Sequence, residues 1–205
     1  MLSFASFTAL VALTALPGIR SESLMCGDAY VVVANRASGD ITLISDGGDA
    51  FNVTLEGPVT PEPMYVSVYG RDVYVGDRAN DRIIKFADAD FDATPTYIDS
   101  CGGIFHMWNN GVQLWVSCNV DNAVDVIDLA TATVVQTIDV NSTGVPHDIV
   151  ATAGKGFATI FVQNDADKIL SFETATFAPV DELTVGEDPH VGVMAGSTTL
   201  VSCFT

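Results

Sequence analysis

Three histidines recur at nearly equal intervals and could together bind a metal ion or move a proton. His106, His147 and His190 are separated by 41 and 43 residues, and Met64 stands 42 residues before His106. An imidazole changes charge near neutral pH, and its neutral nitrogen is a common ligand of zinc and copper. The spacing therefore predicts one ligand-binding group of these four residues, with the three histidines as candidate metal ligands. The alternative is that each histidine packs within its own repeat.

The elements that would position these residues form a repeated unit of about forty residues. The best-preserved copy, at 114–147, holds the β-type runs LWVSC, AVDVIDL and VVQTIDV, separated by the turn-forming sequences NVDN and ATAT. A fourth run follows Pro146 and His147, and weaker copies extend over 29–205. Four short strands per repeat are typical of a propeller blade, because one such sheet cannot bury both of its faces alone. We therefore predict an all-β fold, a β-propeller of four-stranded antiparallel blades, with about four to five blades present.

In such a blade each histidine stands where the chain enters the innermost strand. The fold would therefore bring the three histidines to one mouth of the central channel. Counting strands from Tyr30 gives three, then three sets of four, then two. We therefore expect a propeller that is incomplete at its C-terminus or closed in an unusual way, since a normal ring leaves no exposed edge strand.

An apolar leader precedes the repeats. Residues 1–23 contain an uncharged apolar run that ends at Arg20, a pattern typical of a secretory signal peptide. The remaining residues, 24–205, are then the propeller domain. A leader that is retained would instead act as a membrane anchor.

The charge balance limits the partners. The chain has 26 acidic and 8 basic residues and a formal net charge of -18. Like-charge repulsion argues against nucleic acid and against anionic membrane surfaces. We expect a small-molecule or protein ligand and no nucleic acid, with no membrane association unless the leader is retained.

The four cysteines fit an oxidising compartment. Cys101 and Cys118 are expected to form a disulfide, because an up-down pair of strands brings both to the same end of one blade. Cys203 repeats the position of Cys118 and could pair with Cys26 or with a cysteine of a missing blade. The alternative for Cys26 and Cys203 is that both are small buried hydrophobic residues.

Two sequons begin at Asn52 and Asn141. Asn-x-Ser/Thr is the acceptor of N-linked glycans, so both asparagines are glycosylation candidates. With the leader and the cysteines, they predict a secreted or cell-surface glycoprotein.

The best-preserved repeat resembles the YVTN-type propeller repeats, also described as YncE-like or lactonase-like. The resemblance rests on Asn119, the triplets Val-Ile-Asp at 126–128 and Thr-Ala-Thr at 131–133, and Pro146-His147. Where that family usually has Ser-Pro-Asp-Gly before the second strand, this chain has other turn sequences. The resemblance implies the fold, but not one activity, because such propellers include surface and binding proteins as well as enzymes.

His147 and His190 also resemble a histidine pair of streptogramin-lyase-like propellers. Those enzymes use a glutamate near the end of a second strand, and no glutamate stands at the corresponding places here, which hold Asp77, Cys118-Asn119, Gln163-Asn164 and Cys203-Phe204. This difference weighs against a lyase.

Two functions follow from the sequence. The first is binding of a small ligand or a protein at the channel mouth without catalysis. The second is a metal-assisted lactonase or lyase that uses a divalent metal ion held by His106, His147 and His190.

Overall fold

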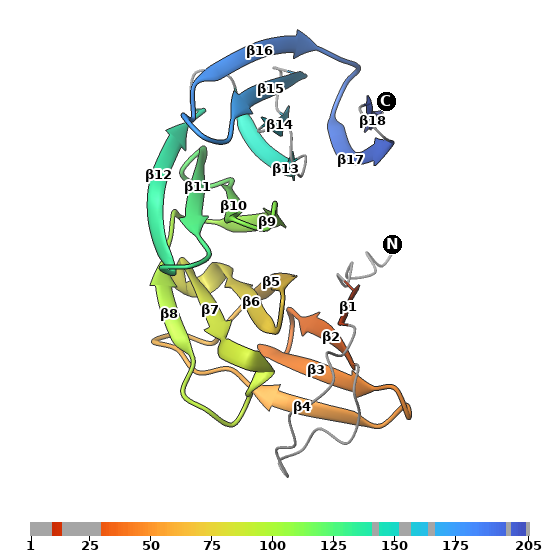
Figure 1. Ribbon diagram of the computed structural model, residues 1–205, viewed down its shortest axis with the longest axis vertical. Helices are drawn as coiled ribbons and strands as arrows, with labels where there is room; N and C mark the ends of the chain where they lie inside the picture. Colours follow the sequence, from red (N-terminus) through yellow and green to blue (C-terminus); the bar gives the residue numbers. More distant parts are fainter. Residues whose placement is uncertain are drawn as a thin grey trace. The chain divides into compact units, whose positions relative to one another are not determined.

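The computed structural model describes residues 10–13, 30–140, 144–151, 157–163, 167–195 and 198–203. Their strands form four four-stranded sheets and one strand pair, each built from consecutive strands (Figure 1). The all-β, propeller-type architecture predicted from the repeat is confirmed.

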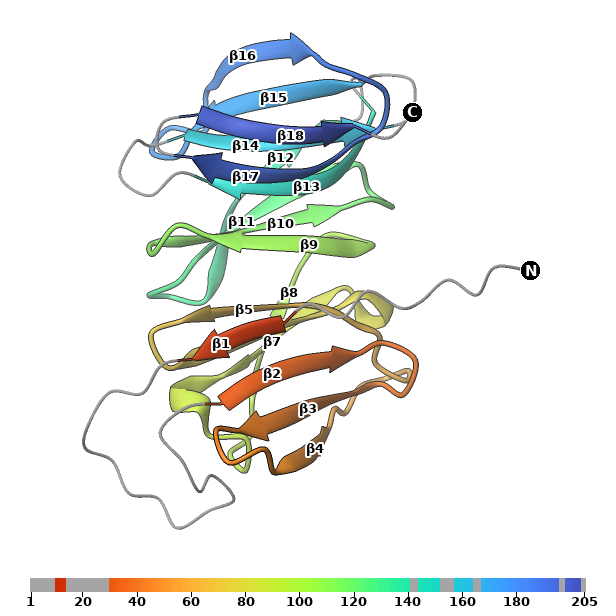
Figure 2. The same ribbon diagram turned by 90° about the vertical axis from the view of Figure 1, so that its right-hand side faces the viewer.

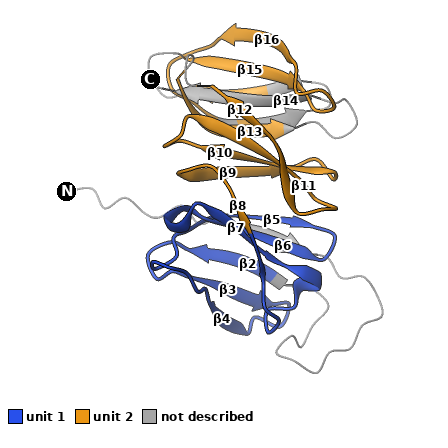
Figure 3. Cartoon of the chain, turned by 90° about the vertical axis from the view of Figure 1, so that its left-hand side faces the viewer, with its two compact units in different colours: residues 1–97 blue, residues 98–205 orange. Residues whose placement is uncertain are grey.

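Two compact units divide the chain, residues 1–97 and 98–205 (Figure 3). The first unit holds β1 (Leu10–Leu13), β2 (Tyr30–Asn35), β3 (Asp40–Ser45), β4 (Ala50–Thr54), β5 (Pro63–Tyr69), β6 (Asp72–Asp77), β7 (Arg82–Phe86) and the start of β8 (Thr96–Asp99), with short 3₁₀ turns at Arg78–Asn80 and Ala87–Ala89. The second unit holds β9 (Ile104–Asn109), β10 (Gln113–Cys118), β11 (Ala123–Asp128), β12 (Thr133–Asp139), β13 (Val145–Ala151), β14 (Phe157–Gln163), β15 (Lys168–Glu173), β16 (Pro179–Thr184), β17 (Pro189–Ala195) and β18 (Thr198–Cys203).

The first sheet has one strand more than the sequence indicated. Leu10–Leu13, inside the expected leader, forms β1 and pairs antiparallel with β2, from Leu10 opposite Val33 to Leu13 opposite Tyr30. The hydrophobic periodicity of a short apolar run does not distinguish a β-strand from the apolar core of a signal peptide. The sequence pattern therefore did not indicate this strand. Among the described residues, no helix is long and apolar enough to cross a membrane.

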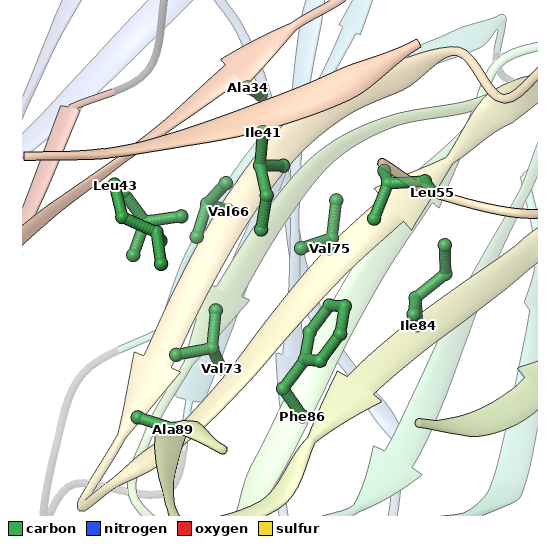
Figure 4. Packing of buried hydrophobic residues seen from close by; sticks show 11 residues of the cluster. Ala34, Ile41, Leu43, Leu55, Val66, Val73, Val75, Ile84, Phe86 and Ala89 are labelled. Carbon is green, nitrogen blue, oxygen red and sulfur yellow. The ribbon is translucent and has the colours of Figure 1, made fainter. Parts of the chain in front are cut away.

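The core of the first unit lies between its two sheets. Alternate residues of β3 are buried, and Ile41 and Leu43 pack with Val66 of β5, Val75 of β6 and Phe86 of β7 (Figure 4). Alternation directs every second side chain toward the neighbouring sheet, so stacking two sheets excludes water from both inner faces.

The core of the second unit joins successive sheets in the same way. Trp115 and Val126 of one sheet pack with Ile149, Leu170 and Phe172 of the next. The strands β9, β13 and β17, each the first of its sheet, contact one another in chain order and lie side by side in Figure 2. This packing places the starts of the three histidine-bearing strands next to each other.

Candidate metal centre

Four strands that begin a sheet share a β-bulge near their N-terminal ends. Between two successive paired residues, each of β5, β9, β13 and β17 contains one residue more than the strand it pairs with. Such an extra residue bends the strand and changes where the neighbouring side chains point. The flanking pairs are Pro63–Asp77 and Tyr65–Gly76 for β5, Ile104–Cys118 and His106–Ser117 for β9, Pro146–Val162 and Ile149–Ile160 for β13, and Pro189–Cys203 and Gly192–Val201 for β17.

The bulges change the repeat position of one histidine. The first bulged residue is Met64 in β5, Phe105 in β9, His147 in β13 and His190 in β17. His106 is the next residue of β9, so it is out of step with the other two histidines by one position. Counting residues between copies did not detect this offset, because the repeats differ slightly in length.

The equivalent rings of the second unit form a row. Phe105 and His147 have ring centroids 4.4 Å apart, and those of His147 and His190 are 4.2 Å apart. The Nδ1 atoms of His147 and His190 lie 3.1 Å from each other. The structure thus brings together two of the three predicted histidine ligands through equivalent atoms.

Asp148 supplies a carboxylate that the sequence analysis did not assign to the site. It is a buried residue, 7% exposed, and its Oδ1 lies 3.4 Å from His147 Nδ1. Successive residues of a regular strand point to opposite faces, but the bulge at His147 and Asp148 lets both side chains reach the same place. The streptogramin-lyase resemblance places an acid near the end of a second strand, whereas Asp148 directly follows His147 in β13, the first strand of its sheet.

His106 has a different role from the other histidines. Its Nδ1 accepts a hydrogen bond of 3.2 Å from the Ile149 backbone N–H, and its Nε2 lies 3.9 Å from Asp148 Oδ1. Burial lowers the pKa of His106 to about 4; His147 and His190 act in the same direction and Asp148 opposes them. A neutral ring whose Nδ1 accepts must carry its proton on Nε2, which faces the carboxylate. His106 is not part of the group of possible metal ligands that His147, Asp148 and His190 form, and its role as a ligand stays a prediction.

His190 favours its neutral form as well. Burial lowers its pKa, and so does His147, while Asp148 and Asp188 oppose this shift. A metal binds a neutral imidazole, so a lowered pKa leaves a ligand nitrogen available at neutral pH.

Two of the three donor pairs, both of which include His147, have the spacing of ligands around one ion. One ligand atom each from His147, Asp148 and His190 lies within 4.8 Å of the other two. Two ligands bound to zinc at about 2.0–2.1 Å, with angles of about 90–110°, are about 2.8–3.4 Å apart. The Nδ1–Nδ1 distance of 3.1 Å and the Nδ1–Oδ1 distance of 3.4 Å fall in that range. Within the described part of the chain, no other group of three histidines, cysteines or acidic residues comes together in this way.

The remaining predicted residues lie elsewhere. Met64 is a half-buried residue of β5 in the first unit. Asn52 is exposed on β4, as a glycan acceptor must be, and its side-chain oxygen accepts a hydrogen bond of 2.8 Å from the Thr42 hydroxyl. Asn141 lies outside the described residues.

The predicted disulfide is confirmed. Cys101 and Cys118 are bonded, with their Cα atoms 5.7 Å apart, and Cys118 is fully buried. Cys203 is exposed and has no disulfide partner among the described residues, and Cys26 lies outside them, so pairing of these two stays a prediction.

Comparison with solved structures supports the fold. The chain superposes on a 6-phosphogluconolactonase-like protein from Bacteroides fragilis with a TM-score of 0.68 and 19% identity, over 85% of this chain and 60% of that protein. A streptogramin B lyase gives a TM-score of 0.69 and 18% identity, over 84% of this chain and 58% of the lyase. The dihydro-haem d1 dehydrogenase NirN gives a TM-score of 0.61 and 15% identity, over 75% of this chain and 35% of NirN.

These similarities define the class of fold. At identities below 20%, they show a β-propeller architecture, and the chain spans 60% or less of the length of each of these proteins. No protein-family profile matches the sequence. No curated protein sequence matches it either.

Proposed function

We propose that this protein is a metal-binding β-propeller in which His147, Asp148 and His190 hold one divalent ion, zinc or copper. The observation that carries the proposal is the convergence of three donor atoms, with Nδ1–Nδ1 and Nδ1–Oδ1 separations of 3.1 and 3.4 Å. In a propeller this site corresponds to one mouth of the central channel. Three protein ligands leave a coordination position for a small ligand, so we assign the protein a binding role there.

The choice of ion follows from the ligands. Two neutral imidazoles and one carboxylate suit zinc and copper better than calcium or magnesium, which prefer oxygen ligands alone. The net charge of -18 raises the local concentration of cations around the molecule.

The ligand at the open position is expected to carry no phosphate group. Each lysine and arginine among the described residues already has an acidic partner: Arg36, Arg71, Arg78, Arg82, Lys85 and Lys168. The described region therefore offers no unpaired cation to a phosphate group. A phosphorylated lactone, as named for the lactonase-like protein, fits this chain poorly.

A second function is metal-assisted opening of a neutral lactone or a related lyase reaction. Two propellers of similar structure are described as a lactonase-like protein and a lyase. An ion with an open position can polarise a carbonyl or lower the pKa of a bound water molecule. Hydrolysis of an uncharged lactone in the presence of zinc, lost in His147→Ala, would favour this alternative over binding alone.

We also propose that the protein belongs to the YVTN type and is secreted. The sequence at 116–147 supports the first, and the disulfide supports an oxidising compartment. Expression through a secretory pathway should yield a glycan on Asn52 that disappears in Asn52→Gln.

Equilibrium dialysis against zinc and copper tests the metal proposal. We expect one ion per chain in the wild-type protein and a loss of at least tenfold in affinity for His147→Ala, His190→Ala and Asp148→Asn. Asp99→Asn removes one exposed carboxylate outside the site and is the control matched in charge. Absence of bound ion in the wild type, or equal binding in all four variants, would contradict the proposal.

A further inference from the structure

We infer that Ser117 and His106 are positioning residues, which fix the two peptide groups on either side of Asp148 and thereby set the geometry of the metal ligands. The inference rests on the proposed metal site. It assigns a role to two side chains that come from the sheet before the one that carries His147 and Asp148.

The bulge in β13 creates the need for such residues. The ladder between β13 and β14 pairs Pro146 with Val162 and Ile149 with Ile160, and it leaves His147 and Asp148 without a paired residue. Backbone polar groups that a bulge releases from the ladder must find other partners when they are buried. Asp148 is buried and Ile149 is fully buried, so water is a poor substitute here.

Ser117 satisfies the peptide group before Asp148. Its hydroxyl is fully buried and donates a hydrogen bond of 2.7 Å to the His147 carbonyl oxygen. The Ser117 hydroxyl oxygen in turn accepts a hydrogen bond of 3.0 Å from the His106 backbone N–H. One hydroxyl therefore links the backbone of β9 to that of β13 at the bulge.

His106 satisfies the peptide group after Asp148. Its Nδ1 accepts the Ile149 N–H, and its Nε2–H faces the Asp148 carboxylate at 3.9 Å. Contacts of this kind, one step removed from the metal, orient ligands, and their removal commonly lowers metal affinity by about 10–100-fold. Together, Ser117 and His106 fix the peptide groups before and after Asp148, the residue that supplies the carboxylate ligand.

Cobalt binding to the full chain tests the inference, since the visible spectrum of Co²⁺ reports ligand geometry. His106→Leu removes the acceptor, whereas His106→Asn keeps an acceptor near the position of Nδ1. We expect about 10–100-fold weaker Co²⁺ binding and an altered spectrum for His106→Leu and for Ser117→Ala. In His106→Asn we expect the affinity and the spectrum of the wild type. Wild-type affinity and spectrum in His106→Leu and Ser117→Ala would overturn the inference.

A second measurement separates this inference from the metal proposal. In the metal-free protein, the Ile149 amide should exchange its hydrogen with solvent at least tenfold faster in His106→Leu than in the wild type or His106→Asn. Absence of Co²⁺ binding by the wild type would overturn the metal proposal, and the Ile149 exchange rate would then decide the positioning role alone. Equal exchange rates in the three proteins would overturn that role.

Discussion

His106 is kept neutral by its surroundings. Burial removes water from the ring, and this effect outweighs the attraction of Asp148, so its pKa falls from 6.5 to about 4. The neutral form is the one that can accept the Ile149 N–H on Nδ1. Protonation of Nδ1 would break the hydrogen bond from the Ile149 N–H and place a charge on a mostly buried ring. The hydrogen bond between His106 and β13 therefore depends on pH.

The folded state should therefore lose stability as the pH falls. Because the pKa of His106 is lowered in the folded protein, the unfolded chain binds more protons between pH 6.5 and about 4. The contribution of neutral His106 to the free energy of unfolding is therefore fully present above pH 6.5 and is lost as the pH falls toward about 4. Between pH 7 and pH 4.5 we expect the metal-free wild type to lose about 2 kcal/mol more than His106→Asn in urea unfolding. Parallel losses in the two proteins would contradict this role.

At the level of elements, the bulged first strands determine the site. The four-strand repeat was predictable from alternating β-branched residues and polar turns, and the Cys101–Cys118 disulfide from the up-down course of β9 and β10. The bulges were not predictable, because one inserted residue leaves no mark on propensity or period. The repeat spacing predicted that His147 and His190 lie close together, and their Nδ1 atoms are 3.1 Å apart. It did not predict that His106 lies one residue later in its bulge, or that Asp148 lies beside His147.

The disulfide should stabilise the sheet that carries His106 and Ser117. Cys101 and Cys118 are 17 residues apart, and closing a loop of this size restricts the unfolded chain by about 3 kcal/mol. Replacing both cysteines by alanine should lower the unfolding free energy by about that amount. A reducing agent should destabilise the wild type and leave the double variant unchanged. Equal urea midpoints for the two proteins would show that the crosslink adds no stability.

Over the whole molecule, the excess of acidic residues dominates the electrostatics. The chain carries 26 acidic residues against 8 basic ones, and the described basic residues are already paired. The acidic residues outnumber the basic ones by 18, so the net effect among the charges is repulsion, which favours cation binding and opposes the compact state.

Added salt should stabilise the folded protein for this reason. Ions screen the repulsion over a distance of about 10 Å at 0.1 M. We expect the melting temperature to rise from low ionic strength to 0.5 M sodium chloride, with little change when sucrose replaces the salt at low concentration. A melting temperature that falls with salt would mean that the ion pairs outweigh the repulsion.

A crystal structure of the protein soaked in zinc, with anomalous scattering recorded at the zinc edge, tests the central claim most directly. The account predicts one anomalous peak about 2.0–2.2 Å from Nδ1 of His147, Nδ1 of His190 and a carboxylate oxygen of Asp148, with Nε2 of His106 outside bonding distance. The absence of a peak among these three residues, or a peak bonded to His106 in place of Asp148, would contradict it.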